Sequence, residues 1–267
     1  MYQALYKELS PQMLQEYLQR IGLDSEGLHQ GLNCALLDKV IYAHQCNIPF
    51  ETLDIYQTGG DISLATDQIF DKLVARRRGG FCFELNGLLD KLLRAIGYQT
   101  RSCLARVINR GDCLPPSLHR LSLVEIGNSL YLADVGLGGT APASALKLKE
   151  GTQTDVLGER FSLEQDGKLC WVLYYHASDG LKKLIHFNIS PQLEVDFLTA
   201  NYYCAHAPDS LFVANRIVSL RKPNGRVQIF NNTFKLVENG ITVVERTVDS
   251  DEDRRIVLGK YFGIEGY

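Results

Sequence analysis

Residues 78–86 place a cysteine where its thiol could act as a nucleophile. They read Arg-Gly-Gly-Phe-Cys-Phe-Glu-Leu-Asn, and an apolar pattern of helical spacing starts at Cys82. The two glycines end the preceding helical pattern and let the chain turn sharply. In the first turn of a helix, free backbone N–H groups and the helix dipole favour the thiolate form of a cysteine. For Cys82 taken alone, a buried structural cysteine is the competing explanation.

A thiolate nucleophile needs a base, and the base needs a group that orients it. His119 opens one run of strand type, and Asp134 stands near the end of the next. The runs 119–126 and 129–135 predict a hairpin across Gly127-Asn128 that brings the two side chains to neighbouring positions. Each has a plain structural explanation when taken alone, as a strand histidine or a turn-capping carboxylate. Together with the cysteine they are the side chains that a Cys-His-Asp site needs.

Two further patterns are weaker indications of a functional site. Residues 136–141 fit G-x-G-x-x-A, but Pro142 follows at once and no βαβ unit surrounds them, so a dinucleotide site is not indicated. A glycine-rich turn at the rim of an active site, or a plain loop, fits better. Cys204 and His206 could bind a metal ion, but no second ligand pair stands at a supporting distance. We therefore predict no metal site.

The elements that must position these side chains change in type along the chain. Four helical patterns fill the first third, and short β-branched or aromatic runs separated by turn residues follow. The helical patterns cover residues 10–22, 36–48, 69–80 and 82–97. The runs of strand type cover residues 100–108, 119–126, 129–135, 169–175 and 184–189.

The last third of the chain mixes both types. Strand-type runs cover residues 212–220, 226–236 and 241–248, between a short helix over 196–204 and a final helix capped by Ser250. Helices, then strands, then a mixture predict an α+β fold with segregated parts.

Composition excludes several classes of protein. The chain has 267 residues, 45% of them hydrophobic and 22% charged, which excludes general disorder, and no long charge-free apolar stretch indicates a membrane span. A net charge of −3 gives no overall attraction to nucleic acid or an anionic membrane. Seven cysteines without a CxxC pair, and no visible secretory signal, favour reduced thiols in a cytoplasmic protein. The oligomeric state stays open.

Taken together, five stretches resemble the arylamine N-acetyltransferase family, in its bacterial type. They occur in the family's order over most of the chain, and RGGxCxExN with a downstream histidine and aspartate is the specific part. The stretches are residues 48–54, 78–86, 119–124, 134–139 and 201–212. The resemblance implies an α+β fold with a papain-like Cys-His-Asp core. Its expected parts are an N-terminal helical bundle (1–97), a central antiparallel β-barrel (98–198) and a C-terminal α/β lid (199–267).

The resemblance also implies a ping-pong acyl transfer with Cys82, His119 and Asp134 as the catalytic residues. Acetyl-CoA, the co-substrate, acetylates the cysteine, CoA leaves, and an arylamine, hydrazine or N-hydroxyarylamine takes the acetyl group. The imidazole would hold the thiolate, and the carboxylate would fix the imidazole tautomer. Arg78 and Glu51 match positions that pair behind the nucleophile.

Further positions are assigned by the same resemblance to the binding of substrates. Phe50, Val107, Leu137 and Phe212 match residues that line the acceptor pocket, and Gly138 is expected beside the co-substrate. Many relatives have phenylalanine where this chain has Leu137, so a flat aromatic wall against the substrate ring is lost.

Departures from the family pattern keep other activities open. Leu137 leaves room for an amide synthase of ansamycin-type macrolactam biosynthesis, which would take its acyl chain from a synthase. Thr52 replaces a frequent asparagine, and residues 204–208 replace a more Ser/Thr-rich stretch, so the CoA contacts in the lid stay open. A transglutaminase-like thiol hydrolase or a thiol peptidase would use the same Cys-His-Asp order. A catalytically inactive binding protein on this fold would not need an intact set of Cys, His and Asp residues.

Overall fold

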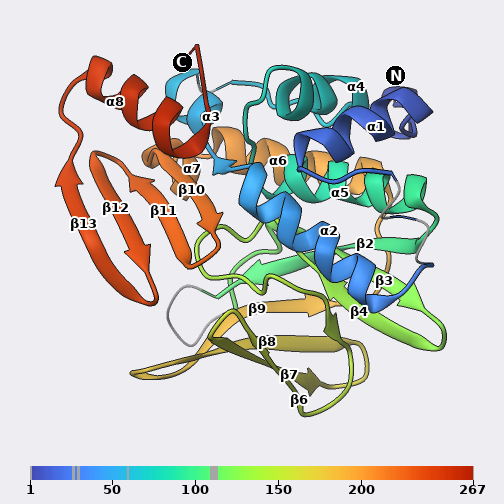
Figure 1. Ribbon diagram of the computed structural model, residues 1–267. Helices are drawn as coiled ribbons and strands as arrows, with labels where there is room; N and C mark the ends of the chain where they lie inside the picture. The colour runs from blue at the N-terminus through green and yellow to red at the C-terminus, as the bar shows by residue number, and fades with distance from the viewer. Residues whose placement is uncertain (1, 26–27, 29–30, 59, 109–113, 267) are drawn as a thin grey trace.

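Figure 1 shows the helices of the first third gathered over a curved sheet, with a second sheet and helix α8 to one side. The structure is a computed structural model that describes residues 2–25, 28, 31–58, 60–108 and 114–266. Its helical elements are η1 (Gln3–Leu5), α1 (Pro11–Arg20), α2 (Cys34–Asn47), α3 (Leu53–Thr58), α4 (Thr66–Phe70), η3 (Asp71–Ala75), α5 (Cys82–Ile96), η4 (Glu194–Asp196), α6 (Phe197–His206), α7 (Leu211–Ala214), α8 (Asp251–Val257) and η5 (Leu258–Phe262). Its strands are β1 (Phe50–Glu51), β2 (Gln99–Val107), β3 (His119–Ile126), β4 (Ser129–Ala133), β5 (Leu146–Lys147), β6 (Thr152–Val156), β7 (Glu159–Asp166), β8 (Cys170–Ala177), β9 (Gly180–Asn188), β10 (Ile217–Lys222), β11 (Gly225–Phe230), β12 (Thr233–Glu238) and β13 (Ile241–Thr247).

Helices α1, α2 and α5 lie within two residues of where the sequence analysis expects them, whereas η1 and α3 are additional. The side chains of Ser10 and Asn33 each accept a first-turn amide of the helix that follows, and Gly97 ends α5 with a φ of 118°. The third helical pattern differs from the expectation. It forms a short α4 that continues into a π-helical turn, η3, which widens the helix just before the cysteine turn.

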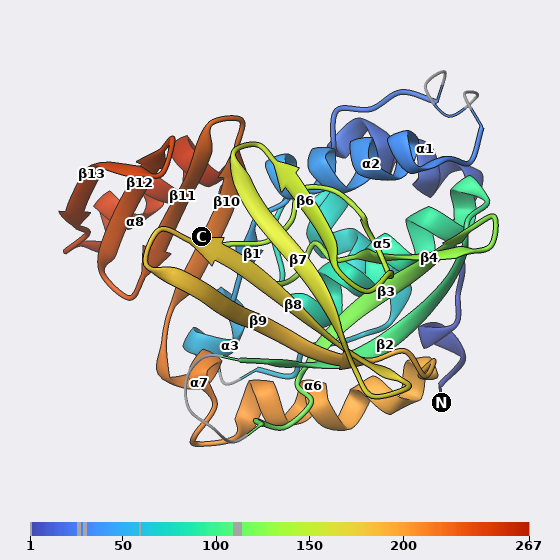
Figure 2. The same cartoon turned by 90° about the horizontal axis from the view of Figure 1, so that it is seen from below.

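The central strands form a nearly closed barrel. Within the described ranges its sheet has eight strands in the order β5-β4-β3-β2-β9-β8-β7-β6, with antiparallel neighbours and with β5 and β6 in contact at the gap. Figure 2 shows the barrel from below, with α6 running along one side and α2 on another. The expected hairpin of β3 and β4 is present, with Ser122 opposite Ala133. Strands β5, β6 and β7 of this sheet lie outside the expected runs.

The last third forms a second sheet, in the order β1-β10-β11-β12-β13. Two expectations for this part are wrong in detail. Residues 226–236 form two strands rather than one, because Asn231 takes a left-handed φ of 54° and turns the chain. The strand expected over 212–220 begins only at Ile217, because Ser210 accepts the amide of Phe212 and starts the short helix α7.

Three apolar clusters hold these parts together. One packs α1, α2 and α5 with α6, a second fills the barrel, and the third lies between the second sheet and the α8–η5 segment. Helix α6 therefore belongs by its packing to the helical cluster, with Phe197 6.1 Å from Phe83 between ring centroids. The division at residues 97 and 198 remains a proposal. Among the described residues, no helix is long and apolar enough to cross a membrane.

Candidate active site

The turn before helix α5 needs its two glycines because other atoms approach them closely. A Cβ added to Gly79 would lie 2.2 Å from the carbonyl oxygen of Pro49, and one added to Gly80 would lie 2.8 Å from Oε2 of Glu84. Neither glycine has a left-handed φ, contrary to the expectation that they supply conformational freedom. The left-handed residue of this segment is Arg77, with a φ of 53°. Steric room, rather than flexibility, explains the Gly-Gly pair.

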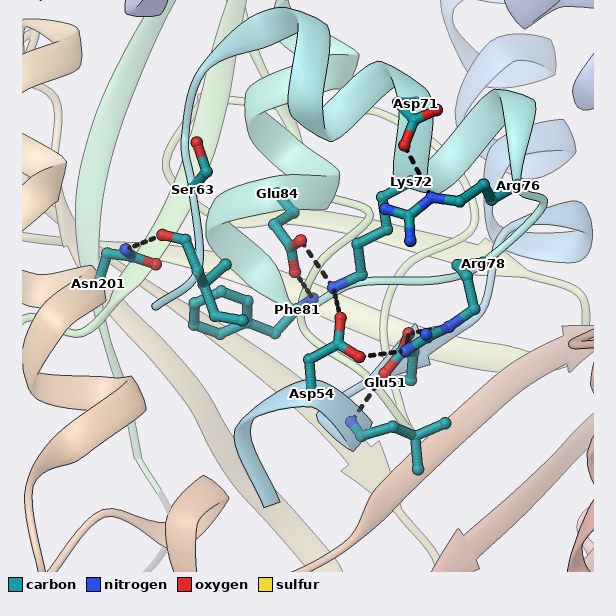
Figure 3. Close-up of polar contacts among 12 residues, drawn as sticks. Glu51, Asp54, Ser63, Asp71, Lys72, Arg76, Arg78, Phe81, Glu84 and Asn201 are labelled. Atoms are coloured by element: carbon teal, nitrogen blue, oxygen red, sulfur yellow. Dashed lines mark hydrogen bonds and ion pairs between the residues drawn. The ribbon is translucent and has the colours of Figure 1, made fainter. Parts of the chain in front are cut away.

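A buried ion pair supports this turn from behind (Figure 3). Nη2 of Arg78 lies 2.7 Å from Oε1 of Glu51, and Nε donates to the same oxygen at 3.1 Å. The other carboxylate oxygen of Glu51 accepts the amide of Leu53 at 2.7 Å, and Arg78 also pairs with Asp54 at 2.8 Å. The ion pair that the resemblance implies is thus present, and it joins β1 and α3 to the segment before the cysteine.

The β3–β4 hairpin brings His119 and Asp134 together. Nε2 of His119 lies 2.6 Å from Oδ2 of Asp134, and both side chains are buried. The other oxygen of Asp134 accepts Asn86 Nδ2 and the amide of Gly136, each at 2.8 Å. Burial lowers the pKa of His119, but the adjacent carboxylate outweighs burial and raises this pKa to about 10. Burial opposes ionisation of Asp134, yet His119 holds the pKa of Asp134 below its usual range.

The remaining ring nitrogen of His119 is available to Cys82, and the two side chains share a hydrogen bond. Sγ of Cys82 also lies 3.7 Å from the carbonyl oxygen of Leu118. Burial raises the pKa of the Cys82 thiol, while the hydrogen bond with His119 and its positive charge act against that shift. A proton kept on the imidazole by Asp134 is therefore what can stabilise a thiolate here.

Two residues that were not singled out as site residues complete the geometry. Asn86 donates to Asp134 and to a carbonyl of β3, and its Oδ1 accepts the amide of Val135 at 2.9 Å. Gly136 packs directly on the cysteine, since an added Cβ would lie 2.7 Å from Cα of Cys82. The spacing of Cys82 and Asn86, four residues apart on one helix face, was the signal available for the asparagine.

A pocket of about 400 Å³ lies against Cys82 and His119. The five residues that the resemblance assigns to substrates all line it, namely Phe50, Val107, Leu137, Gly138 and Phe212. The rings of Phe50 and Phe212 stand 6.1 Å apart between centroids. Further lining residues, which the sequence analysis did not assign to the pocket, include Pro115, Pro116, Leu118, Tyr203 and Leu211.

A second thiol, that of Cys204 in α6, faces the same pocket. Its Sγ lies 3.8 Å from the carbonyl oxygen of Leu118, the oxygen that Cys82 also approaches. Burial raises the pKa of Cys204 to about 12. His206, on the same helix, pairs with Asp61 on the surface. In the part of the chain that the structure describes, no group of three or more His, Cys, Asp and Glu side chains is placed to hold a metal ion.

The fold and the site together define a class of protein. A thiol and an imidazole line an apolar pocket, a carboxylate lies behind the imidazole, and the helices and the barrel supply these three side chains. A model of the N-acetyltransferase family matches residues 33–265. The chain belongs to the arylamine N-acetyltransferase family.

Known relatives agree over nearly the whole chain. The arylamine N-acetyltransferase of Escherichia coli is 32% identical over 255 residues, which is 94% of this chain and 89% of the relative. The solved structure of the Salmonella typhimurium enzyme superimposes with a TM-score of 0.90 at 31% identity and covers 97% of this chain and 92% of the other. The Mycobacterium marinum enzyme, solved in complex with CoA, has a TM-score of 0.85 at 28% identity, with coverages of 94% and 92%.

Proposed function

We propose that this protein is an arylamine N-acetyltransferase that moves an acetyl group from acetyl-CoA, its co-substrate, through Cys82 to an aromatic amine, a hydrazine or an N-hydroxyarylamine. The observation that carries the proposal is the placement of His119 between Cys82 and Asp134 at the base of an apolar pocket. Relatives from E. coli and S. typhimurium carry the same activity in their names, and the second is also named an N-hydroxyarylamine O-acetyltransferase.

In the first half-reaction the Cys82 thiolate attacks the thioester carbon of acetyl-CoA. The bond from that carbon to the CoA sulfur breaks, and CoA leaves as its thiol after taking up the proton held on His119. The buried Asp134 supports the imidazolium until that transfer. The first backbone N–H groups of a helix lack intrahelical acceptors, and those near Cys82 would stabilise the oxyanion.

In the second half-reaction the amine attacks the carbonyl carbon of the acetyl-cysteine, and His119 accepts the proton that the amine loses. The bond from that carbon to the sulfur of Cys82 breaks, and the cysteine leaves as its thiolate beside the protonated imidazole. Weakly basic aromatic amines suit this step because they carry no proton at neutral pH. We assign Phe50, Leu137 and Phe212 to contacts with the acceptor ring and Val107 to the same pocket wall, since all four line it. Leu137 offers an aliphatic surface where a flat ring would stack, which favours acceptors that do not depend on stacking.

Gly138 is assigned to the co-substrate side of the pocket. A Cβ added there would lie 3.2 Å from Cγ of Phe50, and its φ of 67° suits glycine. The backbone at this point therefore runs close to the pocket wall, and a side chain would narrow the entrance. Arg78 and Glu51 are assigned the role of holding the cysteine turn, since neither lines the pocket.

We place the enzyme in the cytoplasm, without a nucleic-acid or membrane partner. The net charge of −3 supports the lack of such partners, and the cysteines within the described residues are free thiols, which suits a reducing compartment. One thiol, that of Cys113, lies outside the described residues.

The proposal is tested by intact-protein mass spectrometry after brief incubation with acetyl-CoA alone, beside a Cys82→Ala control. We expect one acetyl adduct on the wild type, none at this site in the control, and loss of the adduct when 4-aminobenzoate or a hydrazine is added. An enzyme that stays unmodified in acetyl-CoA, while folded, would contradict the proposal.

A second acyl donor belongs in the same experiment. A relative from Fusarium pseudograminearum, 31% identical over 57% of this chain, is named an N-malonyltransferase. We therefore propose malonyl-CoA and longer acyl-CoA thioesters as parallel donors. A faster adduct from one of these would correct the acyl group while leaving the assignment of Cys82 intact.

A further inference from the structure

We propose that Lys72 is a positioning residue for Cys82: it is the counter-ion that keeps the Glu84 carboxylate in place as the cap of helix α5. The inference rests on the proposed role of Cys82 as the nucleophile. Its test, however, measures the thiol itself and does not depend on acetyl transfer.

The cap is a buried carboxylate that holds the residue immediately before the cysteine. Oε2 of Glu84 accepts the amide of Phe81 at 3.1 Å, and the Glu84 side chain is almost fully buried. Gly80 leaves the space that this carboxylate fills, since an added Cβ would lie 2.8 Å from Oε2. The position of Cys82 at the start of the helix therefore depends on where Glu84 is held.

Lys72 supplies the charge that makes this cap possible. Its Nζ donates to the second oxygen of Glu84 at 2.8 Å and lies 2.9 Å from Oδ2 of Asp54, while its own side chain is 8% exposed (Figure 3). Asp54 in turn pairs with Arg78. Lys72 comes from the π-helical turn η3, so a local irregularity of the helix places a cation beneath the cysteine turn.

An unpaired carboxylate at this depth would be costly, so it would take up a proton or move toward water. Burial raises the pKa of Glu84, and Lys72 is the strongest influence in the opposite direction. A carboxylate that moves takes its oxygen away from the amide of Phe81, and a protonated carboxyl accepts more weakly than the carboxylate, so the first turn of α5 would loosen.

Loosening of the first turn of α5 would lower the reactivity of the Cys82 thiol. The titratable groups that face it are His119, with Asp134 behind the imidazole, and Cys204 from α6. Lys72 and Glu84 do not line the pocket, so they act through the backbone position of the cysteine. When Cys82 shifts away from His119, the thiolate loses its hydrogen bond and its counter-charge.

The experiment measures the rate at which iodoacetamide alkylates Cys82 as a function of pH, by peptide mass spectrometry. For Lys72→Met we expect alkylation at neutral pH to be about tenfold slower, which corresponds to an apparent thiol pKa raised by about one unit. Lys7→Met is the matched control, because it removes a lysine from an exposed ion pair with Asp67, and we expect the wild-type profile.

A neutral cap separates this role from a general structural one. In Glu84→Gln the amide oxygen can still accept from Phe81, and the Glu84 charge that Lys72 balances is gone, while Asp54 keeps its pair with Arg78. We therefore expect Cys82 to be alkylated in Lys72→Met/Glu84→Gln at a rate within about twofold of the rate in Glu84→Gln alone. The reason is that the effects of coupled residues are not additive.

Three results would overturn the inference. The first is a folded Lys72→Met protein with the wild-type alkylation profile. The second is a Lys72→Met/Glu84→Gln protein that is alkylated as slowly as Lys72→Met alone. If Lys72→Met does not fold, circular dichroism and alkylation are measured on the double variant instead. The third result that would overturn the inference is a double variant that also fails to fold.

Discussion

Two thiols share the base of the pocket, but only one of them has a cationic partner. Cys82 is hydrogen-bonded to His119, whereas burial alone acts on Cys204 and raises its pKa to about 12. We predict that iodoacetamide at neutral pH labels Cys82 at least about tenfold faster than Cys204, because only the thiolate reacts. Peptide mass spectrometry over time measures both rates. Equal labelling would show that the imidazole does not activate Cys82.

The proton on His119 also links the site to stability. Its pKa is raised from 6.5 to about 10 in the folded protein, so folding is favoured by proton binding. The resulting stabilisation is fully present below the unfolded pKa and is lost as the pH rises through the folded pKa. We predict that the free energy of unfolding contributed by His119 falls between about pH 6.5 and about pH 10.

Urea unfolding of Cys82→Ala and Cys82→Ala/His119→Gln isolates this contribution, because the first substitution removes the coupled thiol. The difference in unfolding free energy between the two proteins should shrink steadily toward alkaline pH. A difference that stays constant or grows with pH would mean that the folded imidazole is neutral.

At the scale of elements, the backbone of the segment after β4 packs directly against the start of α5. We predict that Gly136→Ala slows acetylation of Cys82 by about a hundredfold or more, since a displacement of about 1 Å in a reacting group can cost that much. The reason is the added Cβ, which would lie 2.6 Å from Nδ2 of Asn86 and 2.7 Å from Cα of Cys82. Gly259→Ala is the control, because its nearest contact would be 3.9 Å. A normal acetylation rate in Gly136→Ala would contradict the packing described for this segment.

The loop from Asp134 to Pro142 is closed by one side chain of α2. Nε2 of Gln45 donates to the carbonyl oxygens of both residues, at 3.0 and 2.9 Å, and its Oε1 accepts from Arg221 of β10 at 2.8 Å. We predict that Gln45→Leu lowers the free energy of unfolding by about 1–3 kcal/mol, because buried carbonyls lose their donors. Urea unfolding measures this, with the exposed Gln165→Leu as control. An unfolding free energy equal to that of the wild type would show that the loop does not need this amide.

Elements with strong local signals could be predicted from the sequence, and contacts between distant elements could not. The caps at Ser10 and Ser250 and the hairpin through Gly127 follow from local chemistry, and the structure has them. The Gly-Gly pair was recognised, but its reason was not, because close approach to Pro49 and Glu84 depends on chain packing. The role of Gln45 depends on partners far along the chain, and that of Lys72 on partners in other elements, so no local pattern marks either residue.

At the scale of the whole molecule, the barrel and the second sheet are joined by a cluster of charges. Glu159 of β7 lies 3.2 Å from Arg221 and 3.4 Å from Arg226, both in the second sheet. We predict that Glu159→Gln lowers the free energy of unfolding by about 1 kcal/mol or less, as expected for partly exposed pairs. Added salt should reduce the difference between the two proteins, because it screens the wild-type pairs. Urea unfolding at low and high salt checks this, and a difference that does not respond to salt would assign the effect to packing.

Strand β1 has a consequence for how the enzyme is made. It pairs with β10, so that Phe50 stands opposite Ser219, and it also bridges to Gly80 beside the cysteine turn. A ribosome delivers Cys82 long before it delivers β10, and until then β1 has no partner strand and Phe212 is missing from the pocket wall. The growing chain thus carries its reactive thiol without a finished pocket around it, and it can bind substrate only after Phe212 and β10 have been made.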